Sequence, residues 1–160
     1  MRIGYGEDIH QLGADRPLVL AGVTIPFNAG LIGHSDADVV IHAICDSLLG
    51  ALALGDIGQL FPNTDVRYLN IDSAILLKKT FDLVIENAYQ IHNIDVTVIL
   101  EKPHLAPYIL SMRGRIAEIL QIDVQKISIK AGTNEGLDAI GRGKAIKAIA
   151  VTLLEEIKHD

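Results

Sequence analysis

The segment from Asp36 to Leu54 constrains the fold most strongly, because most positions in it are apolar. A helix that is apolar almost all round has no face to offer to water and must be buried. We therefore expect a helix over these residues at the centre of the molecule, covered on several sides. The sequence Gly55-Asp56-Ile57-Gly58 follows directly and is expected to end it.

Three of the polar side chains in this segment lie on one face of the expected helix. Asp38, His42 and Asp46 follow one another at intervals of four residues, so they form one stripe. Buried carboxylates need partners, because an unpaired buried charge is costly. Two interpretations stay open. Either Asp38 caps the helix and Asp46 pairs with His42 without a metal, or His42 binds a metal ion while Asp46 holds its other ring nitrogen.

The segment from Arg2 to His10 alternates as a β-strand does. Ile3, Tyr5 and Ile9 share one face, and Gly4, Gly6, Asp8 and His10 share the other. The glycines leave space in front of Asp8 and His10. With His42, these residues make a set of one carboxylate and two imidazoles that leaves a fourth position on Zn²⁺ open. An Asp-x-His pattern also arises by chance in exposed strands, but the cleared strand face and the helical stripe together favour a metal site.

Strand-like and helix-like patterns alternate along the rest of the chain. We expect helices and strands over Leu18–Pro26 (a hairpin turning at Ala21-Gly22), Asp72–Gln90 (helix), Ile94–Glu101 (strand), Pro107–Leu120 (helix) and Ile127–Lys130 (strand). Ser35 and Asp38 have the spacing of a capping box, and the segment from Ala145 to Ile157 fits a strand or a helix. The pattern predicts a single α+β or α/β domain over residues 1–160, with one mixed sheet covered by helices and a ferredoxin-like character.

The composition narrows the classes of function. The chain has 160 residues, is 49% hydrophobic and carries a net charge of −6, which excludes a disordered chain and argues against nucleic acid as a partner. The single cysteine, Cys45, allows no internal disulfide. The N-terminal residues lack the apolar core of a signal peptide, and no run is apolar enough to span a membrane. We therefore expect a cytoplasmic protein with no membrane partner.

Three long segments together resemble one known family. GYGEDIH, GLIGHSDADVVIHAICDSLLGALALGDIGQLFPNTD and IKAGTNEGLDAIGRGKAI are similar to the 2-C-methyl-D-erythritol 2,4-cyclodiphosphate synthases of the non-mevalonate isoprenoid pathway. The resemblance covers essentially the whole chain. It implies a lyase that converts 4-diphosphocytidyl-2-C-methyl-D-erythritol 2-phosphate into the cyclodiphosphate and CMP. It also implies a homotrimer whose active sites lie at subunit interfaces.

The resemblance assigns two metal sites and two catalytic residues. It makes Asp8, His10 and His42 the Zn²⁺ ligands and Glu135 the ligand of a second ion, Mg²⁺ or Mn²⁺. His34 and Thr133 are the positions that stabilise the transition state by donating hydrogen bonds to phosphate oxygens. Read without the family, His34 is a surface residue and Thr133 a turn residue.

The resemblance also assigns the substrate contacts. They comprise Asp8, His10, His34 and Ser35; Asp56, Ile57 and Gly58 at the ribose; Phe61, Pro62, Asn63, Thr64 and Asp65 over the methylerythritol; Leu100, Glu101, Lys102, Pro103, His104, Leu105 and Ala106 at the cytosine; and Gly132, Thr133, Asn134, Glu135, Ala139 and Arg142. Local alternatives exist here too: Ser35 can serve as a helix cap, and Asp56 with Gly58 can form a plain helix-ending turn.

The chain departs from the family pattern at several positions. Glu7 stands where an aromatic residue is usual, Asn63 replaces Asp, and His104 replaces Lys. Leu137-Asp138-Ala139-Ile140 stands where Leu-Gly-Phe-Thr is common, and that Phe lines an axial cavity which holds an isoprenoid diphosphate in some members. None of these changes affects the three zinc positions or Glu135.

Two other functions use the same residues. A zinc-dependent hydrolase of small phosphorylated or ester substrates would use Asp8, His10 and His42 with an activated water, although the chain has no HExxH motif. A non-catalytic oligomer would bind nucleotides through Asp56 and residues 100–106.

Overall fold

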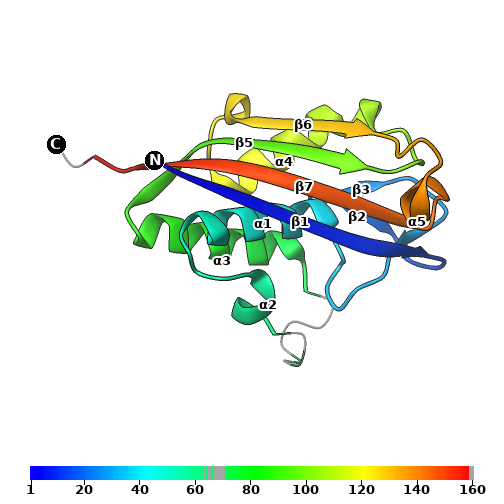
Figure 1. Cartoon of the computed structure of the whole chain (residues 1–160), viewed down its shortest axis with the longest axis horizontal. Coiled ribbons are helices and arrows are strands. Elements are labelled where there is room, and N and C mark those ends of the chain that lie inside the picture. The colour runs from blue at the N-terminus through cyan, green and yellow to red at the C-terminus, as the bar shows by residue number, and fades with distance from the viewer. Residues whose placement is uncertain (63, 65, 67–70, 159–160) are drawn as a thin grey trace.

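The computed structural model describes residues 1–62, 64, 66 and 71–158, and its centre is a five-stranded sheet (Figure 1). The strand order is β4-β1-β7-β5-β6, with bounds Gly30–Leu31 (β4), Arg2–Gly13 (β1), Ala145–Glu156 (β7), Tyr89–Ile99 (β5) and Ile127–Gly132 (β6). Only β5 and β6 pair in parallel among these neighbours, and the other pairs are antiparallel. The predicted mixed sheet is therefore confirmed.

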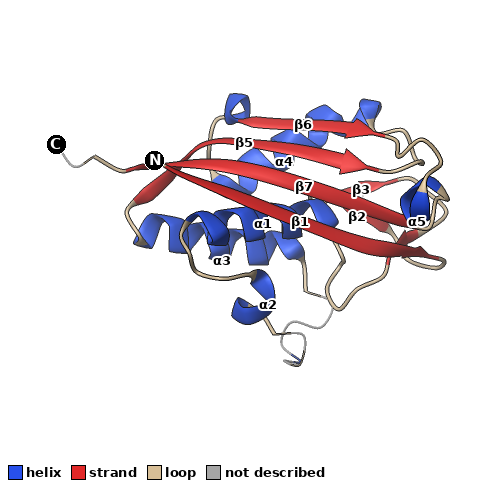
Figure 2. Cartoon of the chain, in the orientation of Figure 1, coloured by secondary structure: helices blue, strands red, loops and turns tan. Residues whose placement is uncertain are grey.

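Helices cover one face of this sheet (Figure 2). The covering helices are α1 (Val39–Ala51), which packs on β1 and β7, α3 (Ser73–Glu86), which packs on α1, and α4 (Ile109–Leu120), which packs on β6 and α3. The shorter elements are α2 (Ile57–Leu60), α5 (Asp138–Gly141), η2 (Ala106–Tyr108) and η3 (Val124–Lys126), with the hairpin β2–β3 (Leu18–Leu20 and Val23–Ile25). The other face of β1 is exposed, as the alternation of its residues predicts.

Helix α1 is the buried element that its sequence predicts. Its residues are buried at nearly every position, including Val39, Ile41, Ile44 and Leu48. It lies between the sheet and α3, so two layers of apolar side chains remove it from water. This position brings the polar residues of α1 against the inner face of β1.

Glycines on β1 allow the strand to approach α1 closely. A Cβ atom at Gly4 would lie 1.8 Å from the carbonyl oxygen of Ser47, and one at Gly6 would lie 2.2 Å from that of Ala43. Real side chains cannot occupy such positions without moving the helix. The glycines therefore set the distance between β1 and α1, and with it the distance from Asp8 to His42.

Asp38 joins the start of α1 to the turn of the β2–β3 hairpin. Its fully buried carboxylate accepts hydrogen bonds from the N–H groups of Ala21 (2.9 Å), Gly22 (2.6 Å), Val40 (3.1 Å) and Ile41 (3.1 Å). Burial raises the pKa of Asp38 to about 6, and these hydrogen bonds oppose that rise. The predicted hairpin turn is confirmed. Asp38 also caps the helix, as one of the two interpretations of the stripe proposed.

Three predicted helix boundaries are wrong, one of which is the end of α1 at Ala51 rather than Leu54. Helix α1 begins at Val39 rather than Asp36, because Ala37 adopts a left-handed conformation with φ of 58°. Ser35 is therefore not the cap of α1, and its hydroxyl accepts the N–H of Ala37 in the preceding turn instead. The helix predicted to reach Gln90 ends at Glu86, since Ala88 has φ of 62° and β5 already begins at Tyr89.

The ambiguous C-terminal segment forms strand β7. It lies between β1 and β5 and pairs with both along most of its length. Ala148, Ala150 and Thr152 face the helices and are fully buried. Pairing on both sides satisfies the backbone groups of β1, β7 and β5, whereas a helix at this place would leave the facing edges of β1 and β5 unpaired.

The structure has no candidate for a membrane-crossing helix among the residues that it describes.

Candidate metal centre and active site

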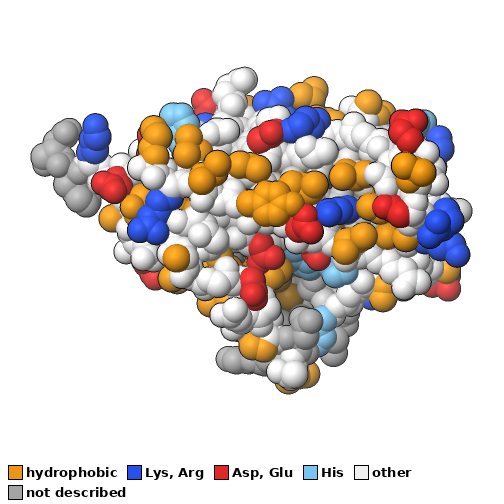
Figure 3. Space-filling model, in the orientation of Figure 1, with side chains coloured by type: hydrophobic (Ala, Val, Ile, Leu, Met, Phe, Trp, Pro, Cys, Tyr) orange, Lys and Arg blue, Asp and Glu red, His pale blue; other side chains and the backbone are white. Residues whose placement is uncertain are grey.

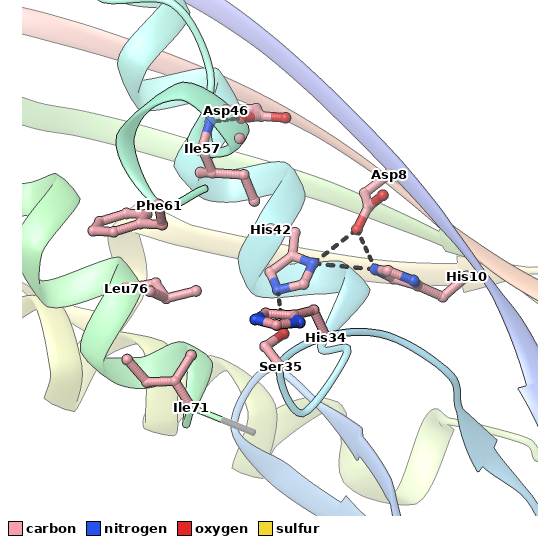
Figure 4. A pocket seen from close by; sticks show the side chains of 11 residues that line it. Asp8, His10, His34, Ser35, His42, Asp46, Ile57, Phe61, Ile71 and Leu76 are labelled. Carbon is pink, nitrogen blue, oxygen red and sulfur yellow. Dashed lines mark hydrogen bonds and ion pairs between the residues drawn. The ribbon is translucent and has the colours of Figure 1, made fainter. Parts of the chain in front are cut away.

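Asp8, His10 and His42 converge on one point from two elements (Figure 4). Asp8 and His10 project from β1, and His42 projects from the middle of α1. The Oδ2 atom of Asp8 lies 2.9 Å from Nε2 of His10 and 2.9 Å from Nδ1 of His42. The two ring nitrogens are 3.2 Å apart. A strand and a helix distant in sequence thus present three ligand atoms to the same small space.

These distances fit a tetrahedral metal ion. Ligand atoms at about 2.0 Å from such an ion lie about 3.3 Å from one another, close to the observed spacings. The Nδ1–H of His10 donates to the carbonyl oxygen of Ile32 at 3.0 Å, so its Nε2 keeps a lone pair directed at the shared point. A donor set of two imidazole nitrogens and one carboxylate oxygen is suited to zinc.

Electrostatics favour the ligand form of Asp8, whereas they favour the protonated form of His10. Burial opposes ionisation of Asp8, but hydrogen bonds from His10 and His42 hold the pKa of its carboxyl well below the ordinary range. Burial lowers the pKa of His10, but Asp8 more than compensates and the pKa is raised overall. Asp8 is therefore a carboxylate at neutral pH, and a metal must compete with a proton only on the imidazoles.

The convergence point opens into a cavity of about 190 Å³. Five residues assigned to the substrate by resemblance line it beside the three ligands: His34, Ser35, Ile57, Gly58 and Phe61. The structure therefore brings this part of the predicted site together. Asp46, Ile71 and Leu76 complete the lining, and the last two are apolar residues that sequence analysis did not select.

His34 is half-buried rather than a surface residue. Its Nε2 atom is buried and has no hydrogen-bond partner among the described residues. Buried polar atoms without partners are uncommon and call for an explanation. The residue as a whole lines the cavity.

The second ring nitrogen of His42 does not contact Asp46, so that prediction is wrong. An oxygen of Asp46 accepts the N–H of Ile57 at 2.8 Å and thereby fixes the start of α2. The Nε2 atom of His42 instead lies 3.1 Å from the hydroxyl oxygens of both Ser35 and Ser73. The turn that carries Ser73 packs closer to this edge of the ring than the next turn of α1 does.

The predicted ribose and methylerythritol residues are only partly assembled. Asp56 caps α2 by accepting the N–H of Gln59 at 2.9 Å, and its side chain is exposed. Pro62 and Thr64 are exposed as well. Asn63 and Asp65 lie outside the described residues.

Comparison with known proteins decides the family. The YgbB family matches residues 1–155. The 2-C-methyl-D-erythritol 2,4-cyclodiphosphate synthase of Brachyspira hyodysenteriae is 53% identical over 158 residues, which are 99% of this chain and all of that protein. That of Clostridium kluyveri is also 53% identical, over 99% of this chain and 98% of its own length. The chain belongs to the YgbB family of cyclodiphosphate synthases.

Solved structures of the YgbB family share the fold. A 2-C-methyl-D-erythritol 2,4-cyclodiphosphate synthase with CDP bound is 37% identical, with a TM-score of 0.89, over 96% of this chain and 100% of that one. IspF of Plasmodium falciparum in a CDP complex is 38% identical, with a TM-score of 0.87, over 98% and 97%. The bifunctional IspDF of Campylobacter jejuni is 41% identical, with a TM-score of 0.94. The match covers 97% of this chain and 42% of that longer chain. The predicted family and fold class are confirmed.

The residues that the YgbB resemblance places at the cytosine form a second pocket. It has a volume of about 170 Å³ and is lined by Leu100, Glu101, Pro103, His104, Leu105, Ala106, Ala131, Gly132 and Thr133. Lys102 lies beside it, with its Nζ atom 3.0 Å from Nε2 of His104. The pocket therefore gathers most of segment 100–106 with the end of β6.

The loop after β6 carries Thr133 and Glu135 side by side. The hydroxyl of Thr133 donates to Oε1 of Glu135 at 2.7 Å. Glu101 accepts the N–H groups of Asn134 (3.0 Å) and Gly136 (3.3 Å), which ties this loop to the segment after β5. Ala139 and Arg142, in and after α5, are exposed.

Within one subunit the two pockets are separate. The register places Asp8 opposite Ala148, Ala148 opposite Val98, and Val98 opposite Ala131. Three strand spacings therefore separate Asp8 from Ala131, or about 14 Å along the sheet. The two pockets share no lining residue. The structure thus unites the predicted zinc ligands with His34 and Ser35, but not with Thr133 and Glu135.

Proposed function

We propose that this chain converts 4-diphosphocytidyl-2-C-methyl-D-erythritol 2-phosphate into 2-C-methyl-D-erythritol 2,4-cyclodiphosphate and CMP. The observation that carries the proposal is the convergence of Asp8, His10 and His42 at the mouth of a cavity. The names of the full-length relatives support the reaction. The CDP in two related structures supports a cytidine nucleotide as ligand.

In this reaction one phosphorus–oxygen bond forms and another breaks within a single molecule. An oxygen of the 2-phosphate attacks the β-phosphorus of the diphosphate. The bond from that phosphorus to the oxygen bridging to CMP breaks, and CMP leaves with the electron pair. Because the nucleophile is already anionic, the protein needs to supply positioning and charge neutralisation rather than a strong base.

Asp8, His10 and His42 would hold Zn²⁺, and Glu135 would hold Mg²⁺ or Mn²⁺. Bound cations neutralise the repulsion between phosphate groups and polarise their oxygens. The described residues that line the cavity beside Asp8, His10 and His42 include no Lys or Arg to provide this charge. The remaining polar groups would then position the substrate. His34 and Ser35 would donate to phosphate oxygens, as would Thr133 once its hydroxyl turns away from Glu135. Asp56 and segment 100–106 would bind the cytidine.

The proposal includes a trimer with active sites between subunits. The uncovered sheet face exposes large hydrophobic side chains, with Ile3 at 72%, Tyr5 at 58% and Ile9 at 52% exposure (Figure 3). Apolar patches of this kind are typical of protein interfaces. A neighbouring copy on this face would bring its own Glu135 pocket toward the zinc pocket, which a single subunit keeps about 14 Å away. We place this enzyme in the cytoplasm, with no nucleic acid or membrane as a partner.

Glu7 has partners on this same face. It accepts a hydrogen bond from Tyr5 and pairs with Lys147 at 3.1 Å. Its exposed carboxylate therefore belongs to a small polar cluster within the apolar surface, at the position where an aromatic residue is common in the family.

The decisive experiment measures CMP release and metal content together. Wild-type protein should release CMP, yield a cyclic product by phosphorus NMR and contain one zinc per chain. His42→Ala should lose zinc and at least about 100-fold in activity, because the centre loses a ligand. His92→Ala is the control, since that exposed imidazole pairs only with Glu155 among described contacts.

The alternatives give different products. A zinc hydrolase would release inorganic phosphate or an acyclic diphosphate. A non-catalytic nucleotide binder would convert nothing even as the wild-type protein, and its His42→Ala variant would keep its cytidine affinity. Either result would contradict the synthase.

A further inference from the structure

The edge of His42 that faces away from the ligand cluster lies between two serines. Its Nε2 atom is 3.1 Å from Oγ of Ser35 and 3.1 Å from Oγ of Ser73. The opposite nitrogen, Nδ1, faces Asp8 and His10. If Nδ1 is to offer a lone pair to a cation, the neutral imidazole must carry its hydrogen on Nε2. One of the two serine oxygens must then accept that hydrogen.

Ser73 is arranged as an acceptor. It is fully buried, and its hydroxyl donates to Oδ1 of Asp36. Its backbone N–H also donates to Oδ2 of Asp36, at 2.9 Å. The hydroxyl hydrogen of Ser73 is therefore committed to a carboxylate, and only lone pairs remain to face His42. A hydroxyl that donates to an anion is also a stronger acceptor, since hydrogen bonds in a chain polarise one another.

Ser35 is arranged differently. Its oxygen already accepts the N–H of Ala37 at 3.1 Å, and its side chain lines the cavity beside His34. When the Nε2–H of His42 donates to Ser73, Nε2 has no lone pair to accept a hydrogen bond from the Ser35 hydroxyl. The hydroxyl hydrogen of Ser35 is free to donate into the cavity.

We propose that Ser73 and Asp36 are positioning residues that fix the tautomer and orientation of His42 through a relay from His42 to Ser73 to Asp36. The relay leaves Ser35 free to donate a hydrogen bond to a phosphate oxygen of the ligand. This inference rests on the metal site of the proposed function. It assigns a role to two residues that touch neither the ion nor the substrate.

The first test compares zinc affinities of metal-free variants by competition with a chromophoric chelator. Ser73→Ala should bind Zn²⁺ about 10–100-fold more weakly than wild type, as is typical when a partner of a ligating histidine is lost. Ser47→Ala is the matched control. Ser47 is equally buried, but its hydroxyl donates to the carbonyl of Ile44 at 2.7 Å, away from His42. The control should keep wild-type affinity.

A second variant tests the effect of Asp36 on the Ser73 hydroxyl without removing that hydroxyl. Asp36→Asn keeps the size of the side chain but removes the charge that polarises Ser73, so it should weaken zinc binding by a smaller factor. The double variant Ser73→Ala with Asp36→Asn should be no weaker than Ser73→Ala alone, because residues in one relay are not additive. The visible spectrum of bound Co²⁺ should change in Ser73→Ala and remain that of wild type in Ser47→Ala.

The outcomes distinguish this relay from the proposed reaction. If Ser73→Ala folds and binds zinc as tightly as wild type, the relay alone is overturned. If Ser73→Ala does not fold, wild-type zinc affinity in Asp36→Asn overturns the relay instead. A loss of affinity in Ser35→Ala as large as that in Ser73→Ala would overturn the division between the two serines. Tight zinc binding without CMP formation would overturn only the reaction, whereas a wild-type protein without zinc affinity would overturn both.

Discussion

Each of the three candidate ligand side chains makes a further hydrogen bond through an atom that does not face the shared point. His10 is fixed by the carbonyl of Ile32, and His42 faces two serine hydroxyls. The other oxygen of Asp8 accepts the N–H of Ile9 at 2.9 Å. Such contacts orient the ligand atoms before any ion arrives, so little conformational entropy remains to be lost on binding.

At this scale we predict that zinc affinity falls as the pH is lowered. A protonated imidazole cannot ligate, and Asp8 raises the pKa of His10 above its ordinary value of 6.5. Affinity should therefore be full above the pKa of His10 and decline as the pH falls through it, while Asp8 stays ionised. Zinc release to a chelating dye tests this between about pH 8 and pH 5, a range that brackets the ordinary histidine pKa. A flat profile would contradict the ligand set.

The same shift has a consequence for the metal-free protein. Because the folded pKa of His10 is raised, its pairing with Asp8 stabilises the fold most below the unfolded histidine pKa. That contribution is lost as the pH rises through the folded pKa.

Among the elements, the β1–α1 pair decides the geometry of the centre. Gly4 and Gly6 bring the strand against the backbone of α1, and Asp38 anchors the start of the helix to the β2–β3 turn. The ligands on β1 and α1 therefore meet because of contacts that involve none of them directly.

We predict that Gly6→Ala weakens both folding and zinc binding. The added methyl group would lie 2.2 Å from the carbonyl oxygen of Ala43, so β1 must move away from α1. Overpacking of this kind costs about 1–3 kcal/mol. Urea unfolding and zinc titration measure the two effects. Gly132→Ala is the control for folding, since a Cβ atom there meets nothing within 4 Å.

We predict that Asp38→Ala lowers the free energy of unfolding by about 3 kcal/mol. The variant loses a helix cap and leaves buried N–H groups of the hairpin turn without an acceptor. Asp72→Ala removes only an exposed cap of α3, because the carboxylate of Asp72 accepts the N–H of Ala74. Its loss should cost about 1 kcal/mol. Equal losses in urea unfolding would show that Asp38 is merely a cap.

At the level of the whole molecule, the chain carries two separate pockets. The zinc pocket lies on the helical side of β1, while the pocket with Thr133 lies at the ends of β5 and β6. An uncovered apolar sheet face lies on the opposite side from the helices (Figures 2 and 3). For the proposed reaction, these features predict that the chain acts as an oligomer.

We predict that Ile3→Lys disrupts the trimer. A charge at this 72% exposed position would have to be buried at the interface. Leu110→Lys is the matched control, because Leu110 is 75% exposed but lies on α4. Sedimentation should show smaller species for Ile3→Lys only, with CMP release lost together with assembly. A monomeric wild type would contradict the shared site.

We further predict that inactive subunits complement one another. His42→Ala lacks the zinc half-site, and Glu135→Gln lacks the second. Unfolded and refolded together, they should form mixed trimers in which some interfaces combine an intact half from each. CMP release above that of either variant alone tests this. Activity no greater than the sum of the two would place each complete site within one chain.

The sequence by itself determined the features that depend on local periodicity and side-chain chemistry. The alternation of β1, the apolar character of α1 and the polar stripe on α1 follow from neighbours a few residues apart, and the residue types made Asp8, His10 and His42 candidate ligands. The cap of α1 was visible as Asp38, although the left-handed Ala37 moved the helix start by three positions from Asp36 to Val39.

The tertiary structure decided what depends on distant partners. Residues 145–156 are a strand because β1 and β5 pair with them on both sides, although their own pattern also fits a helix. His42 turns its second nitrogen to Ser73 rather than Asp46, and Asp36 reaches Ser73 across 37 residues of chain. No local pattern encodes such meetings, because they depend on how whole elements pack.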